Sequence, residues 1–553
     1  MTIARTLRTA RHIPLGQLAA RARFLWLRAR YAAEPALPLA RAVVDAAGME
    51  PTDPLPHLPD GVLWPEGIPE VERRAAEFAS GRFEYLHRAA DFAGGVRWHD
   101  AGASPLWLYQ LHYLGSVADL ARAGRVADAA RVLASWRVEF ENRWDGIAWH
   151  PYPASLRLVN LCVAASCADG FERLGDGAAR LASVHAAYLL RHVEHDVRGN
   201  HILENARALL WAGCAFRGGA AGDCERTARA ILAREIPEQV LPDGGHFEMS
   251  PMYHCIVMRD LLEVRALLGD GDPLVAEHVT PAIARMARFL DGILCPDGGI
   301  PLLGDSVRGY GPPPMVLLAL AGHASETPDG LRSFPDSGLH VFRSRVIWAI
   351  FDAGPVCPSY LPAHGQADTL TVEVWVNGAP IVCDPGVHDY SGPERAWGRS
   401  SRAHSTLTIA DENTSEVHGN FRVGGRAEVA SVVRGDEVAA SMRPFRSSAR
   451  LHRTVSLRGE SLTIEDWAEG PAGGPVRSRL HLDPRVPQLR VEIGPNGPVI
   501  GAYSLIADIE TGGRPCRFED GRVAREFGRT EASTILVQDV PPGQRVRWIV
   551  GPG

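Results

Sequence analysis

The spacing of hydrophobic residues divides the chain into two parts. From Pro105 to Leu294, apolar residues recur at intervals of three and four, which predicts helices. Near His340 the pattern changes to short runs in which apolar and polar residues alternate, which predicts strands. We therefore expect an α+β protein: an (α/α) toroid followed by an antiparallel β-sandwich. Linker composition at residues 330–338 marks the boundary.

This pattern predicts three domains and a series of paired helices. Residues 1–104 are expected to form a helical and irregular extension packed on the toroid, 105–335 the toroid, and 336–553 the β-sandwich. Short connections make neighbouring helices antiparallel, and weak self-similarity favours a toroid over a strict repeat solenoid. Helices are expected over residues 71–79, 106–114, 116–140, 155–174, 178–193, 201–216, 224–236, 253–268 and 281–294.

The stretch 362–409 combines strand periodicity with many polar side chains. Residues 369–376 alternate between polar and apolar, which is typical of a half-buried strand, and Asn377-Gly378 suits a tight hairpin turn. His364, Gln366 and Asp368 have period-two spacing, so we expect them to project from one side where the strand begins. Polar groups at a strand entrance suggest a functional site.

Composition then excludes several classes of protein. The 553 residues carry a net charge of −7, and no basic field argues for nucleic acid. Every basic side chain counted as Lys or Arg is an Arg, which excludes Walker-type phosphate loops, Schiff-base chemistry and pyridoxal enzymes. The nine cysteines are scattered without a CxxC pair, as expected of reduced thiols.

The N-terminal sequence is basic but does not predict export. It has several Arg and no acid before Glu34, and its longest apolar run, Phe24 to Leu27, is too short for a signal peptide. No run approaches the roughly 18 apolar residues of a membrane span. We therefore expect a cytoplasmic protein whose first helix packs on the domain with Arg outward; a basic helix on an anionic membrane surface is the alternative.

Three segments of the helical part contain polar residues that helix packing does not require. They are residues 149–160, 198–213 and 242–262. Asn200, His201 and Glu204 are spaced to cluster at a helix N-terminus. Each segment also has a structural interpretation: Asn200 as a helix cap, His201 as a hydrogen-bonded core histidine, and Tyr253 as a packing residue.

Taken together, these segments resemble the heparinase II/III family of polysaccharide lyases. The resemblance spans roughly residues 100–410, in the order found in the family, and implies an (α/α) toroid followed by a β-sandwich. It rests on W-H-P-Y-P-x-S-L-R-x-x-N at 149–160, N-H-x-x-E-N at 200–205, D-G-G-H-F-E-x-S-P-M-Y-H at 243–254, H-x-Q-A-D at 364–368, D-P-G at 384–386 and R-x-x-R-A-H-S-T at 399–406.

The resemblance implies β-elimination at a uronic acid of an anionic polysaccharide or oligosaccharide. The carbanion formed at C5 places charge beside a carboxylate, so hydrogen-bond donors must stabilise it; Asn200 and His201 match the family residues for this role. Tyr253 and His364 match the proton-transferring pair, and Glu204 matches a supporting residue that would orient His201. Because a tyrosine has a pKa near ~10, a cationic neighbour of Tyr253 is expected.

Further residues are candidates for binding substrate or a metal. Arg side chains suit sulfate or carboxylate groups, although structural ion pairs are the alternative. The resemblance also implies one structural divalent metal, zinc or calcium, at Gln366, Asp384 and His404; Gln366 is a poorer zinc ligand than the family's histidine, so a hydrogen-bonded cluster is equally expected. The substrate-binding candidates are Arg97, Trp149, His150, Tyr152, Arg157, His246, Arg399 and Arg402.

Two other functions stay open. A toroid glycoside hydrolase would use two carboxylates as acid and base, for which Glu204, Asp243, Glu248 and Asp305 are candidates. A non-catalytic sugar-binding protein of exopolysaccharide biosynthesis is the third interpretation, favoured by the expected cytoplasmic location. The sequence does not select among heparan-like, chondroitin-like, hyaluronate, alginate and bacterial uronate polymers, nor does it give the oligomeric state.

Overall fold

The chain forms two compact units in a computed structural model that describes residues 3–92, 94–100, 102–486, 490–494, 497–502 and 507–553. The helical unit comprises Pro14–Gln239 and Val257–Ile283. The β unit comprises Met1–Ile13, Val240–Ile256 and Ala284–Gly553. The three-domain division at residues 104/105 and 335/336 stays a prediction. No helix of the described ranges has the length and apolar content needed to span a membrane.

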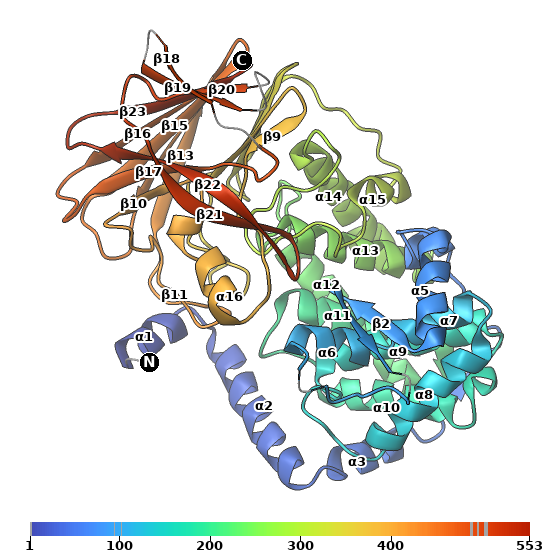
Figure 1. Cartoon of the computed structure of the whole chain (residues 1–553). Coiled ribbons are helices and arrows are strands. Elements are labelled where there is room, and N and C mark those ends of the chain that lie inside the picture. Colours follow the sequence, from blue (N-terminus) through green and yellow to red (C-terminus); the bar gives the residue numbers. More distant parts are fainter. Residues whose placement is uncertain (1–2, 93, 101, 487–489, 495–496, 503–506) are drawn as a thin grey trace. The chain divides into compact units, whose positions relative to one another are not determined.

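The helical unit is the toroid, built from helices that pack on their neighbours in the chain (Figure 1). α11 packs against α9, α10 and α12, while α9 also contacts α6 and α7, so these two helices form the centre of the unit. The helices are α2 Leu15–Ala33, α3 Leu37–Asp45, α4 Asp60–Leu63, α5 Ile68–Ser80, α6 Pro105–His112, α7 Gly115–Arg122, α8 Val126–Phe140, α9 Pro151–Cys167, α10 Ala178–Arg191, α11 Gly199–Ala215 and α12 Ala221–Gln239.

Most predicted helices are present, with shifted ends. α13 (Pro251–Leu268) and α14 (Thr280–Ile293) run from one unit into the other. The predicted helix 155–174 was wrong at both ends: α9 starts at Pro151, because proline is well suited to the first helical turn, and a separate 3-10 turn covers Phe171–Leu174. Ser155 therefore lies inside α9, where its hydroxyl donates to the Pro151 carbonyl.

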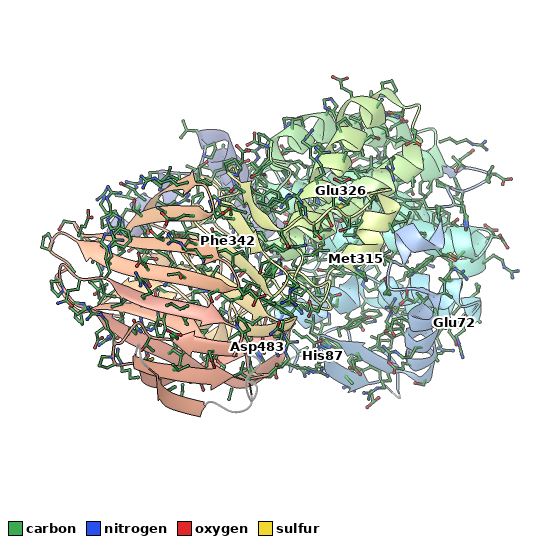
Figure 2. The ribbon with its side chains drawn as sticks, turned by 90° about the horizontal axis from the view of Figure 1, so that it is seen from above. Glu72, His87, Met315, Glu326, Phe342 and Asp483 are labelled. Atoms are coloured by element: carbon green, nitrogen blue, oxygen red, sulfur yellow. The ribbon has the colours of Figure 1, made fainter. Side chains whose placement is uncertain are left out.

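The β unit contains a sandwich of antiparallel sheets. A five-stranded sheet has the order β5-β6-β7-β8-β9, an eight-stranded sheet has the order β13-β14-β15-β16-β23-β20-β19-β18, and a four-stranded sheet has the order β10-β17-β22-β21. Phe342 lies among these strands in Figure 2 and belongs to the core that the three sheets share.

The elements of the β unit are α1 Ile3–Ala10, α15 Pro314–Leu320, α16 Gly392–Gly398, β5 Gly330–Phe334, β6 Leu339–Arg343, β7 Ile347–Asp352, β8 Val372–Val376, β9 Ala379–Val382, β10 Leu407–Ile409, β11 Val417–His418, β12 Arg422–Val423, β13 Glu428–Arg434, β14 Glu437–Arg443, β15 Arg450–Arg458, β16 Ser461–Glu469, β17 Val476–His481, β18 Arg490–Gly494, β19 Gly497–Ala502, β20 Ala507–Glu510, β21 Arg517–Glu526, β22 Arg529–Val540 and β23 Val546–Gly551. The helical unit adds a two-stranded sheet of β1 Glu50–Pro51 with β4 Phe216–Arg217, and a hairpin of β2 Arg82–Tyr85 with β3 Arg88–Asp91.

The predicted strand 369–376 is shorter and more deeply buried than expected. β8 starts at Val372, and the positive φ of Leu370 (70°) helps to place the preceding residues in a loop, so His364, Gln366 and Asp368 do not line a strand face. All of β8 is buried, because one face of the sheet packs in the sandwich core and the other, through Trp375, packs on Phe289 and its neighbours. The side of β8 that an alternating pattern would expose to solvent is therefore covered by a second hydrophobic core, which contains Trp375 and Phe289.

Candidate functional site

In the β unit, His364 is held between two carboxylates. Its Nδ1 donates to Asp305 at 3.0 Å and its Nε2 donates to Glu248 at 3.1 Å. Burial lowers the pKa of His364, but the hydrogen bonds to Asp305 and Glu248 outweigh burial and raise the pKa to about 9. At neutral pH the imidazole is therefore a cation in a fixed orientation.

Asp305 anchors this arrangement from the interior. Its carboxylate accepts hydrogen bonds from the Arg395 guanidinium, from Nδ1 of His364, and at 2.8 Å from the amide nitrogen of Gln366. Burial alone raises the pKa of Asp305, but Arg395 and His364 outweigh it and hold the pKa well below its ordinary value. Asp305 is thus an ionised acceptor that fixes three side chains.

Tyr253 stacks on the His364 ring. The two ring centroids lie 3.8 Å apart at an interplanar angle of 24°, and the Tyr253 hydroxyl shares a hydrogen bond of 2.9 Å with the Tyr390 hydroxyl. The expected cationic neighbour is therefore present. Burial, followed by the nearby Tyr390, nevertheless raises the pKa of Tyr253 well above 10. Both members of the pair carry protons at neutral pH.

In the helical unit, His201 has a carboxylate partner that the sequence did not indicate. Its Nδ1 donates to Glu194 at 3.0 Å, and Tyr152 lies against its ring at a centroid distance of 4.3 Å. Asn205 donates to the other Glu194 oxygen and accepts from the Glu194 backbone N–H. Burial raises the pKa of Glu194, but His201 and the other partners outweigh it and lower the pKa. Glu194 is an ionised acceptor that orients His201.

Glu204, which is predicted to support His201, pairs with Arg207 in the structure. Its two oxygens accept from Nε and Nη2 of Arg207, whereas the carboxylate that orients His201 is Glu194. The reason is helical geometry: Arg207 follows Glu204 by three positions, which places both on the same face of α11. Burial raises the pKa of Glu204 to about 7, with Arg207 opposing the rise.

The start of α11 has an unusual backbone. Arg198 and Gly199 have φ values of 64° and 57°, so two successive residues before Asn200 lie in the left-handed region. A non-glycine residue there costs about 1 kcal/mol or more and persists where its surroundings fix it. This turn sets the direction of the first helical residues, Asn200, which is buried, and His201, which is partly exposed.

Several predicted substrate-binding residues are buried in packing roles. Arg157 is 0% exposed and donates to His185 and to two backbone carbonyls. Trp149 stacks on His185 at 4.4 Å, and Arg399 donates to the carbonyls of Gly365, Gly419 and Arg422. For Arg157 and Arg399 these contacts favour the structural alternative.

The other substrate-binding candidates differ in exposure. Arg97 and Arg402 are exposed, the first over the Phe92 ring and the second 3.7 Å from Glu519. His150 lies 3.6 Å from Glu194, which brings it to the His201 cluster together with Tyr152. His246 is buried, and burial lowers its pKa to about 4.

The predicted metal ligands are buried, and each already forms hydrogen bonds within the protein. Gln366 donates to Asp305 and to the Gly304 carbonyl, and Nδ1 of His404 donates to Asp384 at 2.8 Å. One atom of each side chain, namely Gln366 Oε1, Asp384 Oδ1 and His404 Nε2, is buried without a hydrogen-bond partner among the described residues. Over the same residues, no group of three His, Cys, Asp or Glu side chains is arranged as a metal site.

The sequence analysis missed four residues that shape the two clusters: Glu194, Glu248 as the partner of His364, Tyr390 and Arg395. Arg395 lies on α16, directly after the D-P-G motif region, and Glu194 lies in the loop before α11. Neither position belongs to a periodic pattern, and a carboxylate seven residues before His201 gives no recognisable spacing signal.

Two family models match the chain. The model described as Heparinase II/III N-terminus matches residues 179–310, and the one described as Heparinase II/III-like, C-terminal, matches residues 326–549. Together they account for more than half of the sequence. The matched segments contain Tyr253 and His364 as well as the Asn200–Asn205 motif.

Individual relatives resemble the chain over different spans. A heparin-sulfate lyase of Bacteroides stercoris is 28% identical over 42% of this chain, and the match covers only 38% of that lyase. The FtsZ-localized protein C of Caulobacter vibrioides is 26% identical over 81% of this chain and 82% of its own length. A crystal structure of heparinase III has the same fold, with a TM-score of 0.68, 19% identity, and coverage of 87% of this chain and 84% of that one.

Proposed function

The chain belongs to the heparinase II/III family, and on this basis we propose that it is a polysaccharide lyase that cleaves a uronate-containing polymer by β-elimination. The observation that supports the proposal most directly is the stack of Tyr253 on His364, whose two nitrogens are fixed by carboxylates. A tyrosine and a histidine supply two proton-transferring groups without a carboxylate acid–base pair.

In the proposed reaction, Tyr253 and His364 divide the two proton transfers. One of them, after losing its own proton to solvent as the substrate binds, takes the C5 proton, and the other, still protonated, gives a proton to the departing O4. The C4–O4 bond breaks and a C4–C5 double bond forms. Because both His364 nitrogens are hydrogen-bonded, the substrate must displace Glu248 from Nε2 before the imidazole can react with the sugar. The Tyr253 hydroxyl has only to exchange Tyr390 for a sugar oxygen.

The residues at the start of α11 would stabilise the charge that develops at the substrate carboxylate. Asn200 would contribute its amide and His201 its imidazole, whose Nδ1 donates to Glu194. Glu194 keeps His201 in one orientation, so the imidazole is positioned in advance for the anion. Glu194 is in this proposal a positioning residue, and Asn205 holds it in place.

We also propose that Gln366, Asp384 and His404 hold one divalent cation, with the three buried, unpartnered atoms as ligands. The imidazole nitrogen and the carboxylate oxygen are typical zinc ligands, and the amide and carboxylate oxygens are typical calcium ligands. The cation would brace the loop that carries His364 and would take no part in proton transfer. Metal analysis of the purified protein tests this: His404→Ala should lose the bound metal, and equal metal content in both proteins would contradict the proposal.

The test of the lyase function is absorbance of the unsaturated uronate during incubation with uronate polymers, with reducing ends assayed in parallel. Heparin and heparan sulfate come first, because several relatives are named heparin-sulfate lyases. Tyr253→Phe and His364→Ala should each lower turnover by about 1,000-fold or more while polymer binding persists. Reducing ends without absorbance would show hydrolysis, and normal turnover in both variants would refute the site.

A non-catalytic role is the second candidate, supported by the long match to FtsZ-localized protein C. That match extends over four fifths of both chains, whereas the match to the B. stercoris lyase covers two fifths of this chain. In that case the chain would bind a sugar polymer or a protein partner without cleaving it. Binding of a uronate polymer with neither absorbance nor new reducing ends, over a panel that includes bacterial exopolysaccharides, would favour this function.

A further inference from the structure

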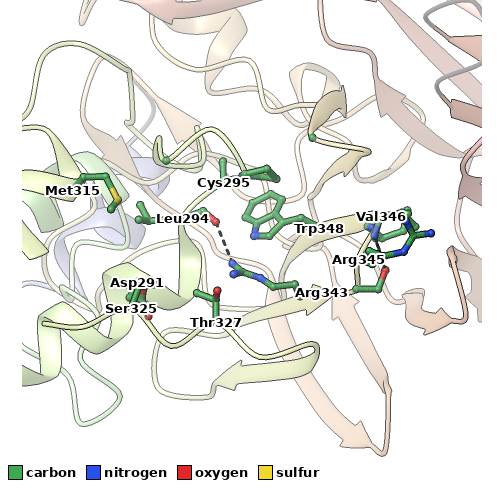
Figure 3. Close-up of a pocket in the computed structure, with 15 residues that line it drawn as sticks. Asp291, Leu294, Cys295, Met315, Ser325, Thr327, Arg343, Arg345, Val346 and Trp348 are labelled. Atoms are coloured by element: carbon green, nitrogen blue, oxygen red, sulfur yellow. Dashed lines mark hydrogen bonds between the residues drawn. The ribbon is translucent and has the colours of Figure 1, made fainter.

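A pocket of about 390 Å³ in the β unit shares no residue with the Tyr253–His364 cluster (Figure 3). Strands β6 and β7 form one wall, and the segments around Leu294 and Thr327 form others. Its size lies within the ~300–1,000 Å³ typical of small-molecule sites. Apolar side chains, including Leu294, Met315 and Val346, line much of it.

Arg343 brings to this pocket a cation that feels the charges of Asp291 and Asp329 without a direct ion pair to either. The side chain is partly buried, and its hydrogen bond to the Leu294 carbonyl is long, at 3.4 Å. Among the described residues no carboxylate forms an ion pair with it. The acid that lines the pocket, Asp291, already accepts from the Ser325 hydroxyl at 2.6 Å and from a backbone N–H.

Three buried arginines of this unit have more hydrogen-bond acceptors than Arg343 has. Arg395 and Arg453 each pair with an aspartate through two nitrogens, and the Arg399 guanidinium donates to three backbone carbonyls. A desolvated guanidinium normally has such acceptors, because burial without them is costly. Arg343 retains donor capacity on the side that faces the pocket.

Trp348 adds a second donor beside Arg343. The two residues are direct cross-strand partners on β6 and β7, which places their side chains on the same face of the sheet. Trp348 is 3% exposed, and its Nε1 is buried without a hydrogen-bond partner. Figure 3 shows the nitrogen edge of the indole on the side of the guanidinium. The Arg343 guanidinium and the Trp348 indole N–H are therefore neighbouring donors that suit one acceptor group with more than one oxygen.

We propose that this pocket binds the carboxylate of a uronate sugar, with Arg343 and the Trp348 indole N–H holding the two oxygens. The planar fork of arginine matches a carboxylate, and the apolar wall suits the face of a sugar ring. A free phosphate or sulfate would fill only a small part of the volume and leave that wall uncovered. The proposal rests on the proposed function and deepens it, since the polymer to be cleaved carries uronate carboxylates along its length.

The experiment is titration of protein labelled with ¹⁵N-tryptophan, observed through its indole N–H resonances. Trp348→Phe identifies the Trp348 signal by its loss. Glucuronate should shift that signal, whereas glucose, which has no carboxylate, and inorganic phosphate at the same concentration should leave it in place. A shift by phosphate as large as that by glucuronate, or no shift by glucuronate, would overturn the proposal.

Variants test the arginine directly. Arg343→Gln should weaken glucuronate binding by about tenfold or more, and Arg343→Lys, which keeps the charge without the fork, by less. The matched control is Arg529→Gln, which removes the same charge from a 62% exposed side chain paired with Glu526 and outside the pocket; it should change binding less than about twofold. Equal weakening by Arg343→Gln and Arg529→Gln would refute a specific contact.

This readout is independent of turnover. The titration repeated on Tyr253→Phe should give the same Trp348 shift, because that residue does not line the pocket. If the chain proves to lack lyase activity while the shift persists, the proposed function fails and the pocket assignment stands. If activity is present and no shift occurs, the pocket assignment alone fails.

Discussion

The pair Asp305–Arg395 allows the anchoring of His364 to be measured as a free energy. Both side chains are almost completely buried, and Asp305 accepts from Arg395, His364 and Gln366. Asp305→Asn keeps the shape of the side chain but leaves the Arg395 cation buried without its counter-charge. Breaking a buried pair in this way costs about 3–5 kcal/mol.

The expected changes in the free energy of unfolding follow from that range. Because asparagine keeps one acceptor oxygen, we expect Asp305→Asn to lower the free energy of unfolding by about 3 kcal/mol. Arg395→Gln should cost a similar amount, since it leaves the carboxylate unpaired. The double variant removes both charges together and should cost about 4 kcal/mol, which leaves a coupling energy near 2 kcal/mol.

Urea unfolding followed by tryptophan fluorescence measures these values, with a three-state fit where the two units unfold separately. The control is Asp539→Asn in the surface pair with Arg517, where both side chains are partly exposed. That change should cost less than about 1 kcal/mol. Strictly additive costs for Asp305→Asn and Arg395→Gln, or costs as small as the control, would refute the view that a buried ion pair anchors His364.

Two further changes test the D-P-G turn and the His201 cluster. Gly386→Ala should lower the free energy of unfolding by about 3 kcal/mol or more, because its φ is 64° and a Cβ would lie 2.1 Å from the Ala524 carbonyl oxygen. The control is Gly392→Ala, where φ is 76° and no atom lies within reach of a Cβ. In the same thermal or urea melt it should cost about 1 kcal/mol. Glu194→Gln should lower turnover about 10- to 100-fold with the fold intact, because His201 loses its orienting acceptor. Since the folded-state pKa of Glu194 is lowered, its ionised form stabilises the wild type above the ordinary glutamate pKa of about 4.3. This advantage over the variant should vanish as the pH falls through the lowered pKa, and an unchanged gap between the two stability curves would contradict this.

Periodicity predicts the elements of this chain better than it predicts the contacts of their polar residues. The three- and four-residue spacing located α5 to α14, because that spacing reports which helix face is buried, although the stretch 116–140 is divided into α7 and α8 and α9 ends well before residue 174. The same signal does not show that β8 packs against two cores, since the second core is supplied by residues of α14 distant in sequence. Nor does it pair His364 with Glu248 or His201 with Glu194. The motifs located reactive residues, whereas their partners depend on tertiary structure.

The pairing of carboxylates with arginines bears on the choice between elimination and hydrolysis. A glycoside hydrolase needs one carboxyl group that is protonated and able to donate to the leaving oxygen. The pKa of Asp305 is held well below its ordinary value. Burial raises the pKa of Glu204 to about 7, but both of its oxygens accept from Arg207, which leaves neither to donate to a leaving oxygen. Asp243 accepts from the hydroxyl and backbone N–H of Ser337.

These carboxylates thus serve as acceptors that fix neighbouring groups. In the His364 cluster, Tyr253 and His364 carry a transferable proton at neutral pH, one through burial beside Tyr390 and the other through its two carboxylate partners. A uronate already has a carboxylate that activates its C5 proton, so its cleavage needs proton carriers and charge-stabilising donors more than a second carboxyl group. The chemistry of this cluster therefore favours elimination, and the same argument requires that Glu248 give up His364 when the substrate binds.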